Sequence, residues 1–237
     1  MAERSTGLGD KDRAVLAEAP LLGALGADDR ARLTAALRAL DVPSGGMVMT
    51  VAQPGEVVMI VLAGTLQVQV EQADGSLVIL AFLGPGDCVG EMGPLEGAER
   101  SATVLALEPS RLAWLPREAF LAHLGAMPGL AAGLAAVLAG RLRQANERIQ
   151  ALATLDVGAR LARQLGALAA EHGTPAEGGG RRILPRLSQS ALADLIGASR
   201  EQVNRSLGGL RRAGIVRVEA DHRIVVIDPE RLARRGG

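Results

Sequence analysis

Residues 188–213 read SQSALADLIGASREQVNRSLGGLRRA, and this stretch decides the fold of the C-terminal part of the 237-residue chain. Leu192, Leu195 and Ile196 recur at the spacing of the inner face of a short helix. Gly197 then suits a tight turn that requires a positive φ. The stretch therefore predicts two helices that are joined by a short turn.

The second of these helices begins with a capping box. Ser199 and Gln202 form an S-x-x-Q pattern, in which each residue bonds the backbone of the other. Val203, Leu207 and Leu210 share one face of the helix that follows. The opposite face carries polar and charged side chains, namely Glu201, Asn204, Arg205 and Arg212.

This arrangement predicts a helix-turn-helix whose second helix enters the major groove of DNA. Arginine can bond guanine and glutamate can accept from cytosine, which suits Arg200, Glu201 and Arg205 to base recognition. The predicted DNA-binding set is Ser188, Ser199, Arg200, Glu201, Asn204, Arg205 and Arg211. Six arginines are candidates for phosphate contacts: Arg181, Arg182, Arg186, Arg211, Arg217 and Arg223. The alternative is a helical hairpin whose charged face is only solvated.

The charge of the chain separates along the sequence, although its 26 basic and 26 acidic residues cancel. Residues 1–155 hold 12 basic and 17 acidic groups, and residues 156–237 hold 14 and 9. Residues 181–217 alone carry a net charge of +6. This concentration, and the hairpin predicted over IVRVEA and RIVVID as a wing, favour duplex DNA. Single-stranded binding is disfavoured because the chain has three aromatic residues, Phe82, Trp114 and Phe120.

Residues 41–116 have the pattern of short strands. Runs of Val, Leu and Ile are separated by glycine, and TLQVQVE alternates with period two. These features predict an antiparallel sandwich or barrel. Before it, residues 27–40 predict a helix with three leucines on one face (Leu33, Leu37 and Leu40), and residues 1–20 predict a loose charged arm.

A long helix is predicted between the two regions, from about residue 130 to 154. Leu134, Leu138, Leu142, Ala145, Ile149 and Leu152 form a near-heptad seam. A helix of this length exceeds what one small domain can cover, so the seam predicts packing against a second copy. Asp156 begins the next helix, which ends at a Gly-rich loop over 173–180.

Residues 119–140 carry no formal charge and are just long enough to span a bilayer. Pro128-Gly129 divides the run near its middle, and Ala and Gly dominate it. We therefore expect two buried helical segments that meet at Pro128, and no membrane. The charged N-terminus lacks a signal-peptide core, and a cytoplasmic location is expected.

Catalytic and metal-binding patterns are absent from the sequence. The single cysteine, Cys88, permits no internal disulfide and cannot by itself supply a zinc or iron–sulfur site. No H-x-x-H, Walker loop or G-x-S-x-G appears. We therefore expect no enzyme, no metal and no cofactor.

Two short motifs in the strand-rich region and one in the predicted second helix carry a family resemblance. Gly90-Glu91-Met92-Gly93 and Glu99-Arg100-Ser101-Ala102, with Gly64 and the Gly84–Gly86 turn, resemble a cyclic-nucleotide-binding β-roll. The SRE-x-V-x-R pattern at Ser199–Arg205 is similar to the recognition helix of the CRP/FNR family of bacterial transcription regulators. The order of elements matches this family from about residue 20 to 230.

The resemblance implies an α+β fold with an N-terminal antiparallel, jelly-roll-like β-roll, a long dimerisation helix and a C-terminal winged helix-turn-helix. The implied division is an arm over 1–20, the β-roll domain over 21–128, the dimerisation helix over 129–155 and the DNA-binding domain over 156–237. The joint at Leu155-Asp156 is the expected hinge.

The family also implies roles for residues that match its motifs. Arg100 would pair with a cyclic phosphate, and Ser101 would donate its hydroxyl to it. Glu91 would accept from the ribose 2′-hydroxyl, while backbone N–H groups around Gly90 and Met92 would complete the cradle. A salt bridge between Glu91 and Arg100 that only closes a loop is the structural alternative.

The base end of the pocket departs from the family. The resemblance implies that two adjacent positions on the long helix, which are hydroxyl residues in a cyclic AMP-binding member of the family, contact adenine, and here these positions are Ala145 and Asn146. Ala145 cannot hydrogen-bond through its side chain, whereas Asn146 can. The predicted ligand set is Gly90, Glu91, Met92, Arg100, Ser101 and Asn146.

Together these features predict a ligand-responsive transcription regulator. Its effector would be a cyclic nucleotide, with cyclic AMP favoured, and its partners a second copy of the chain, palindromic double-stranded DNA and RNA polymerase. One alternative is a regulator of the same family that uses another effector or none. A second alternative is a cyclic-nucleotide-binding regulatory subunit that acts through protein contacts.

Overall fold

The structure is a computed structural model that describes residues 7–73, 75, 77–184, 187–220 and 223–237. The chain forms two compact units. The first comprises residues 1–74 and 80–143, and the second comprises residues 75–79 and 144–237. Helix α5 (Pro128–Thr154) contributes residues to both units.

Two four-stranded sheets are built from the strands before residue 117. The first has the order β1 (Arg38–Val42), β8 (Ser110–Pro116), β3 (Val57–Ala63) and β6 (Cys88–Val89). The second has the order β2 (Met47–Met49), β7 (Thr103–Ala106), β4 (Leu66–Glu71) and β5 (Leu77–Leu83). The pairings within the first sheet are antiparallel, as are those of β7 with β2 and β4. The antiparallel β-roll predicted from the sequence is confirmed.

Strand β3 holds the core of the first unit together because both of its faces are buried. Val58, Ile60 and Leu62 belong to one apolar cluster, which they share with helical residues. Met59 and Val61 belong to the other cluster, which lies among the strands. A strand that is buried on both faces reads as a continuous apolar run, which explains VVMIVLA.

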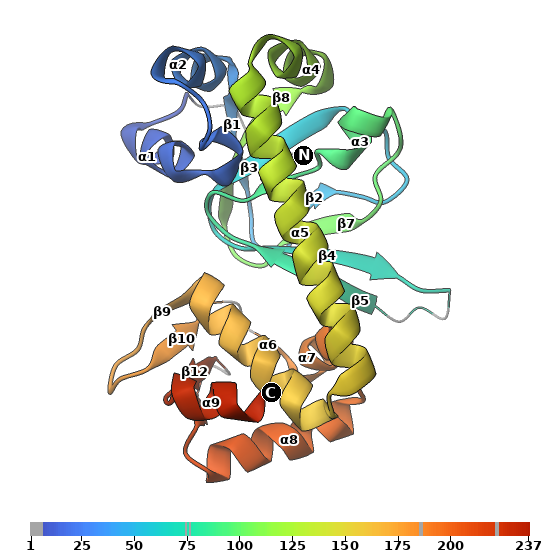
Figure 1. Cartoon of the computed structure of the whole chain (residues 1–237), viewed down its shortest axis with the longest axis vertical. Helices are drawn as coiled ribbons and strands as arrows, with labels where there is room; N and C mark the ends of the chain where they lie inside the picture. The colour runs from blue at the N-terminus through green and yellow to red at the C-terminus, as the bar shows by residue number, and fades with distance from the viewer. Residues whose placement is uncertain (1–6, 74, 76, 185–186, 221–222) are drawn as a thin grey trace. The chain divides into compact units, whose positions relative to one another are not determined.

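Five helical segments join this core, and Figure 1 shows α1, α2 and α4 near β1 and β8. They are α1 (Asp10–Glu18), the 3-10 helix η1 (Pro20–Leu22), α2 (Ala27–Ala36), α3 (Met92–Glu96) and α4 (Arg117–Ala126). Leu16, Leu22 and Phe120 are each almost fully buried. The helices therefore cover apolar surface that the first sheet alone would expose.

Two expectations for the N-terminal region are wrong. Residues 10–18 form a helix instead of a loose arm, because Leu16 enters the core and Arg111 binds the carboxylate of Asp12 at 3.1 Å. The helix expected over 27–40 ends at Ala36, since Leu40 is drawn into β1 opposite Leu112 of β8. Both errors arise from partners that lie far away in the sequence.

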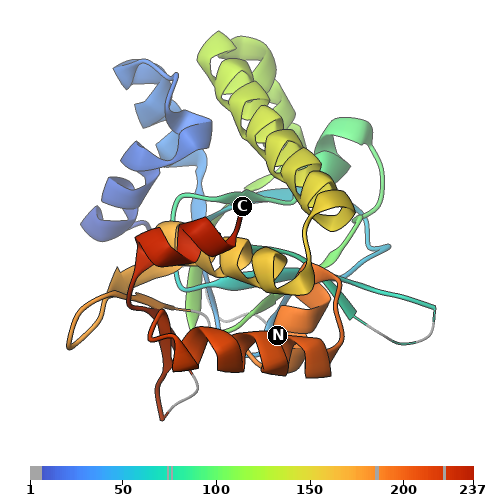
Figure 2. The same ribbon diagram turned by 60° about the horizontal axis from the view of Figure 1, so that its bottom comes forward.

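The second unit is a small α+β domain. Its elements after α5 are α6 (Val157–His172), β9 (Gly173–Pro175), β10 (Arg181–Ile183), α7 (Gln189–Ile196), α8 (Arg200–Arg212), β11 (Val216–Val218), β12 (Ile224–Val226) and α9 (Pro229–Arg235). The strands form one sheet in the order β11-β12-β10-β9. Helix α6 packs against α7, α8 and α9 (Figure 2).

The second unit also changes one prediction. The Gly-rich loop expected over 173–180 begins as strand β9, which pairs with β10. The predicted hairpin of β11 and β12 is confirmed, while its turn at Asp221-His222 lies outside the described residues.

The predicted seam on the long helix divides into two parts. Leu134 is buried in the core of the first unit, and Leu138 packs partly against that core. Leu142, Ile149 and Leu152 are 63%, 64% and 48% exposed. The first two leucines of the seam are thus largely used within the chain itself, and only the later residues form a free stripe.

Helices α4 and α5 meet at Pro128 as expected, with a bend of 111° between them. Within the described residues no single helix has the length and apolar character needed to cross a membrane, and this bent pair meets the criterion only by length and composition.

Candidate functional site

The first candidate site is the loop that leaves β6 and returns through Arg100. Gly90 follows the strand with φ at 80°, in the left-handed region that favours glycine. A Cβ at this position would lie 2.7 Å from Nη1 of Arg100 and 2.9 Å from Cε of Met49. Only glycine therefore lets the Arg100 guanidinium lie this close to the backbone.

The guanidinium of Arg100 is held by two backbone carbonyls. The residue is 6% exposed, and its Nη1 donates to Gly90 O at 2.6 Å while its Nη2 donates to Val57 O at 2.8 Å. Burial lowers the pKa of Arg100, and the negative charge of Glu91 opposes that shift. Arginine stays protonated in proteins. Because carbonyls bring no net charge, the buried cation favours an anionic ligand.

Glu91 supplies the acidic group of the site. It is 1% exposed and forms an ion pair with Arg141 of α5, which also donates to Cys88 O. The alternative salt bridge between Glu91 and Arg100 does not form, because Glu91 pairs with Arg141. The Cys88 thiol lies 4.0 Å from the second carboxylate oxygen, Oε2. Burial and the charge of Glu91 raise the pKa of this thiol, so it remains a neutral, weak donor.

Sequence reasoning missed Arg141. The available signal was that Arg141 is the first charged residue after the uncharged stretch 119–140. A cation at that point of a helix that covers the site is positioned to reach a buried carboxylate.

The other predicted ligand residues have different surroundings. Ser101, which follows Arg100, and Met92, the first residue of α3, are both exposed. Asn146 is exposed on α5, five residues beyond Arg141, and it belongs to the second unit. The structure thus brings Gly90, Glu91 and Arg100 together within the first unit.

The second candidate site is the helix pair α7 and α8. Gly197 joins them with φ at 61° and ψ at 53°, as the turn required. Each helix has a serine N-cap: Ser188 Oγ accepts from Ala191 N at 3.0 Å, and Ser199 Oγ accepts from Gln202 N at 3.2 Å. The capping box of α8 is complete, which confirms its predicted beginning.

The two faces of α8 separate as predicted. Val203, Leu207 and Leu210 are buried. On the outer face Arg205 Nη2 donates to Glu201 Oε1 at 2.7 Å, and their side chains are 74% and 81% exposed. An ion pair this exposed is weak, so both groups remain available to a partner.

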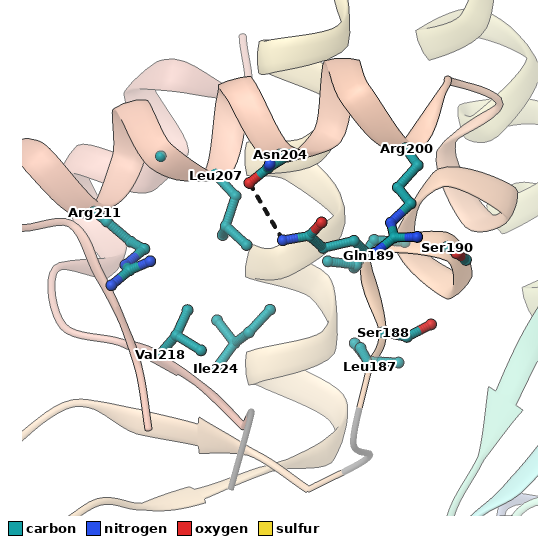
Figure 3. A pocket seen from close by; sticks show the side chains of 12 residues that line it. Leu187, Ser188, Gln189, Ser190, Arg200, Asn204, Leu207, Arg211, Val218 and Ile224 are labelled. Atoms are coloured by element: carbon teal, nitrogen blue, oxygen red, sulfur yellow. Dashed lines mark hydrogen bonds between the residues drawn. The ribbon is translucent and has the colours of Figure 1, made fainter. Parts of the chain in front are cut away.

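A cleft of about 620 Å³ lies beside α8, between the start of α7 and the strands β11 and β12 (Figure 3). Its apolar lining includes Leu187, Leu192 and Ile224. Its polar lining comes from Ser188, Gln189, Ser190, Arg200, Asn204 and Arg211. Arg200 and Arg211 lie at opposite ends of the cleft in Figure 3, so two cations flank it.

Three of the arginines predicted to hold phosphates already have hydrogen-bond partners within the second unit. Arg181 donates to Ala169 O and Gly173 O, and Arg182 binds Glu219 through two N–H groups. Arg217 donates to Glu177 O. The acceptors are carbonyls of α6, of the first residue of β9 and of the loop after β9, together with the carboxylate of Glu219. Arg186 lies outside the described residues.

Arg160 of α6 connects the end of α5 to the turn between α7 and α8. Its Nε donates to Ile196 O at 3.0 Å, Nη1 to Leu155 O at 3.0 Å and Nη2 to Gly197 O at 3.2 Å. The predicted helix start beside it is confirmed, since Asp156 caps α6 through Ala159 N. The sequence contained no signal for this contact beyond a lone arginine in the first turn of α6.

Comparison with known proteins identifies both regions. A family model described as a cyclic nucleotide-binding domain matches residues 39–126, and one described as a Crp-like helix-turn-helix domain matches residues 159–235. The chain is 33% identical to the CRP-like cAMP-activated global transcriptional regulator of Mycobacterium tuberculosis, over 93% of this chain and 98% of that protein.

Two solved structures are also similar. The catabolite activator protein of Thermus thermophilus is 30% identical with a TM-score of 0.53, over 92% of this chain and 98% of the other. The c-di-GMP responsive global regulator CLP of Xanthomonas campestris is 25% identical with a TM-score of 0.72, over 85% and 99%.

Proposed function

This chain belongs to the CRP/FNR family of transcription regulators, and we propose that it acts as a homodimer whose affinity for a palindromic DNA site is controlled by a cyclic nucleotide, with cyclic AMP favoured. The observation that carries the ligand part is the buried Arg100 cation, whose two acceptors are carbonyls. The relative from M. tuberculosis is named a transcriptional regulator, which supports a regulatory and not an enzymatic role in this proposal. The division of the chain into four parts, with boundaries after residues 20, 128 and 155, is part of this proposal.

The phosphate end of the ligand would lie against Arg100. A cyclic phosphate carries the negative charge that the two carbonyls lack, and it would form a charge-assisted hydrogen bond with the guanidinium. Ser101 is adjacent and exposed, so its hydroxyl is free to donate to the same phosphate. The backbone N–H groups around Gly90 and Met92 would complete the cradle.

The ribose would bind Glu91. One carboxylate oxygen, Oε1, accepts from Arg141, while Oε2 has only the weak thiol contact at 4.0 Å. Oε2 is therefore the atom that would accept from the 2′-hydroxyl. The ion pair with Arg141 would keep the carboxylate in place while Oε2 accepts from the ribose.

The identity of the base is the finer part of the proposal. Asn146 would contact the purine through its amide, because Ala145 cannot. Cyclic AMP is favoured because the relative from M. tuberculosis is named cAMP-activated. Another effector, or none, is the alternative, and the neighbour described as c-di-GMP responsive makes that class worth including in the test.

Calorimetry tests this choice. The intact protein is titrated with cyclic AMP, cyclic GMP and c-di-GMP, and we expect the largest affinity for cyclic AMP. No heat with any of them at millimolar concentration, with DNA binding intact, would refute a nucleotide effector. If cyclic GMP or c-di-GMP binds more tightly than cyclic AMP, that nucleotide becomes the proposed effector.

Dimerisation would use the free stripe of α5, defined as Leu142, Ala145, Ile149 and Leu152. These residues are spaced 3, 4 and 3 apart, as in a coiled coil. Their exposure leaves apolar surface that a second copy would cover. Sedimentation of the L142E/I149E double variant tests this: we expect a monomer, and a variant that remains a dimer would refute the stripe.

DNA would bind along α8. Arg200, Glu201, Asn204 and Arg205 lie in the N-terminal half of the helix, which enters the major groove in this motif. Ser188, Ser199 and Arg211 would contact phosphates. The two serine oxygens accept from backbone N–H groups, but each hydroxyl hydrogen remains available to donate.

The dimer would place two recognition helices about 34 Å apart, one helical turn of DNA. If the double variant R200A/R205A binds every duplex as well as the native protein, the DNA-reading assignment is wrong. The chain would then be a nucleotide-binding subunit that acts through protein contacts.

Ligand and DNA would be coupled through the joint between α5 and α6. A ligand shifts an equilibrium only by its different affinities for two states. Arg160 bonds Leu155 O on one side of the joint and Gly197 O in the turn on the other, so movement at the joint would reach the recognition helix. RNA polymerase is the expected partner once DNA is bound.

A further inference from the structure

Two carboxamides link the helices of the DNA-reading element. Gln189 is the first residue of α7, and its Nε2 donates to Oδ1 of Asn204 at 3.2 Å (Figure 3). Asn204 lies in the second turn of α8 and is exposed, while Gln189 is half-buried. The contact spans fifteen residues of sequence. It therefore fixes one side chain of the recognition helix from a different helix.

We propose that Gln189 is a specificity-determining residue: it orients the amide of Asn204 so that Asn204 offers N–H donors to DNA and selects a base with a major-groove acceptor (guanine, adenine or thymine) over cytosine. This inference rests on the proposed DNA-binding function and adds the base class that one position reads. Gln189 acts through Asn204 and is a positioning residue.

The geometry of a planar amide explains how Gln189 would set the orientation of Asn204. Oδ1 and Nδ2 are the two arms of the planar group and diverge from its carbon, so an oxygen that faces α7 directs the nitrogen away from α7. Asparagine recognises adenine with both arms at once, by accepting from N6–H and donating to N7. That contact requires Oδ1 to face the base. With Oδ1 accepting from Gln189, the group turned toward DNA is a donor for guanine O6 or N7, adenine N7 or thymine O4, whereas cytosine presents only its N4–H donor.

The neighbours of Asn204 support a donor surface. Arg200 is one turn earlier on α8 and lines the same cleft, and Arg205 is the next residue. Both side chains are donors only. The acceptor on this part of the helix is Glu201, whose Oε1 is 2.7 Å from Arg205. A half-site that matches this surface presents acceptors at the bases that Arg200, Asn204 and Arg205 reach.

The test is enrichment of bound duplexes from a random-sequence pool, with saturating cyclic AMP in every reaction. Native protein is compared with Q189L, Q189E and N204A. A glutamate at 189 can only accept, so it would bond Nδ2 of Asn204 and turn Oδ1 toward the base. Ser190→Glu is the matched control, because it adds the same charge one residue later in the same cleft.

We expect native protein to disfavour cytosine roughly tenfold at one position of each half-site, about the value of a single base contact. Q189E should reverse that preference toward a donor base, adenine or cytosine. Q189L should relax the preference, and N204A should abolish it. Ser190→Glu should weaken binding to all sequences without changing the preferred base.

An unchanged base preference in both Q189E and N204A would overturn the inference, provided that the variants keep the native melting temperature. A preference that N204A abolishes and Q189E leaves unchanged would show that Asn204 reads the base without help from Gln189, which also overturns it. If native protein enriches no sequence, the proposed DNA-binding function itself has failed, and this outcome is distinct from the other two.

Discussion

The loop around Arg100 and the recognition helix α8 both depend on arginine, but they use it in opposite environments. Arg100 is 6% exposed and fixed by two carbonyls. Arg205 has a side chain that is 74% exposed and is paired only with the equally exposed Glu201. One guanidinium is desolvated before any partner arrives, and the other is still hydrated.

The difference follows from the size of the proposed partner. A small anion offers few contacts, so a strong interaction requires a cation that is already oriented in a low dielectric. A DNA duplex offers a long row of charges and base edges, so many exposed groups each contribute a little. Substitutions in the first region should therefore have large effects on one ligand, and substitutions in the second should have moderate, sequence-dependent effects.

The largest effect is expected for Arg100→Ala. Removing one partner of a buried, hydrogen-bonded charge contact costs about 2–5 kcal/mol, so nucleotide affinity should fall at least roughly thirtyfold. Calorimetry with cyclic AMP measures it. Arg100→Lys keeps the charge without the two-pronged contact, so its nucleotide affinity should lie between those of the native protein and Arg100→Ala. Native affinity in Arg100→Ala would remove the contrast between the two regions.

Arg205→Ala should have the next largest effect. Loss of one major-groove arginine should cost about 1–3 kcal/mol for the preferred DNA site and relax specificity at one base pair. Fluorescence anisotropy with the preferred site and a single-base variant measures both. Cyclic AMP affinity in the absence of DNA should not change. An equal loss for all DNA sequences would make Arg205 a phosphate contact instead.

Arg160→Gln tests the connection between the two regions. It removes hydrogen bonds to Leu155 O, Ile196 O and Gly197 O, and we expect the coupling free energy between nucleotide and DNA to fall by about 1–2 kcal/mol. The measurement is the ratio of DNA affinities with and without cyclic AMP. Arg163→Gln is the control, because Arg163 binds only the exposed Glu147, at 3.3 Å. A ratio that is unchanged in Arg160→Gln contradicts the role.

Gly197→Ala should have the smallest effect. Its φ of 61° is unfavourable for alanine, and the new Cβ would lie 3.1 Å from Cδ2 of Leu152. Stability should fall by about 1 kcal/mol, which thermal unfolding can detect. Gly209→Ala is the matched control, because a Cβ there meets nothing within 4 Å in the interior of α8, and it should stabilise slightly. A Gly197→Ala variant as stable as the native protein would show that the turn relaxes.

The sequence predicted the helix-turn-helix more completely than the ligand site. Its capping box, its left-handed glycine and its buried leucines are local features whose spacing is visible within 26 residues. The ligand loop could be recognised only as a motif. Arg141 is fifty residues from its partner Glu91, and no local pattern links the two.

The sequence by itself determined the order of a region of short strands, a long helix, and a helix-turn-helix followed by a hairpin, because hydrophobic period, caps and turn glycines act over a few residues. The tertiary structure alone decided which arginines are free. Arg181, Arg182 and Arg217 look like DNA ligands in sequence, yet they satisfy carbonyls and Glu219 within the second unit. Charge is a property of a residue, whereas its availability depends on which buried polar groups the fold brings within reach.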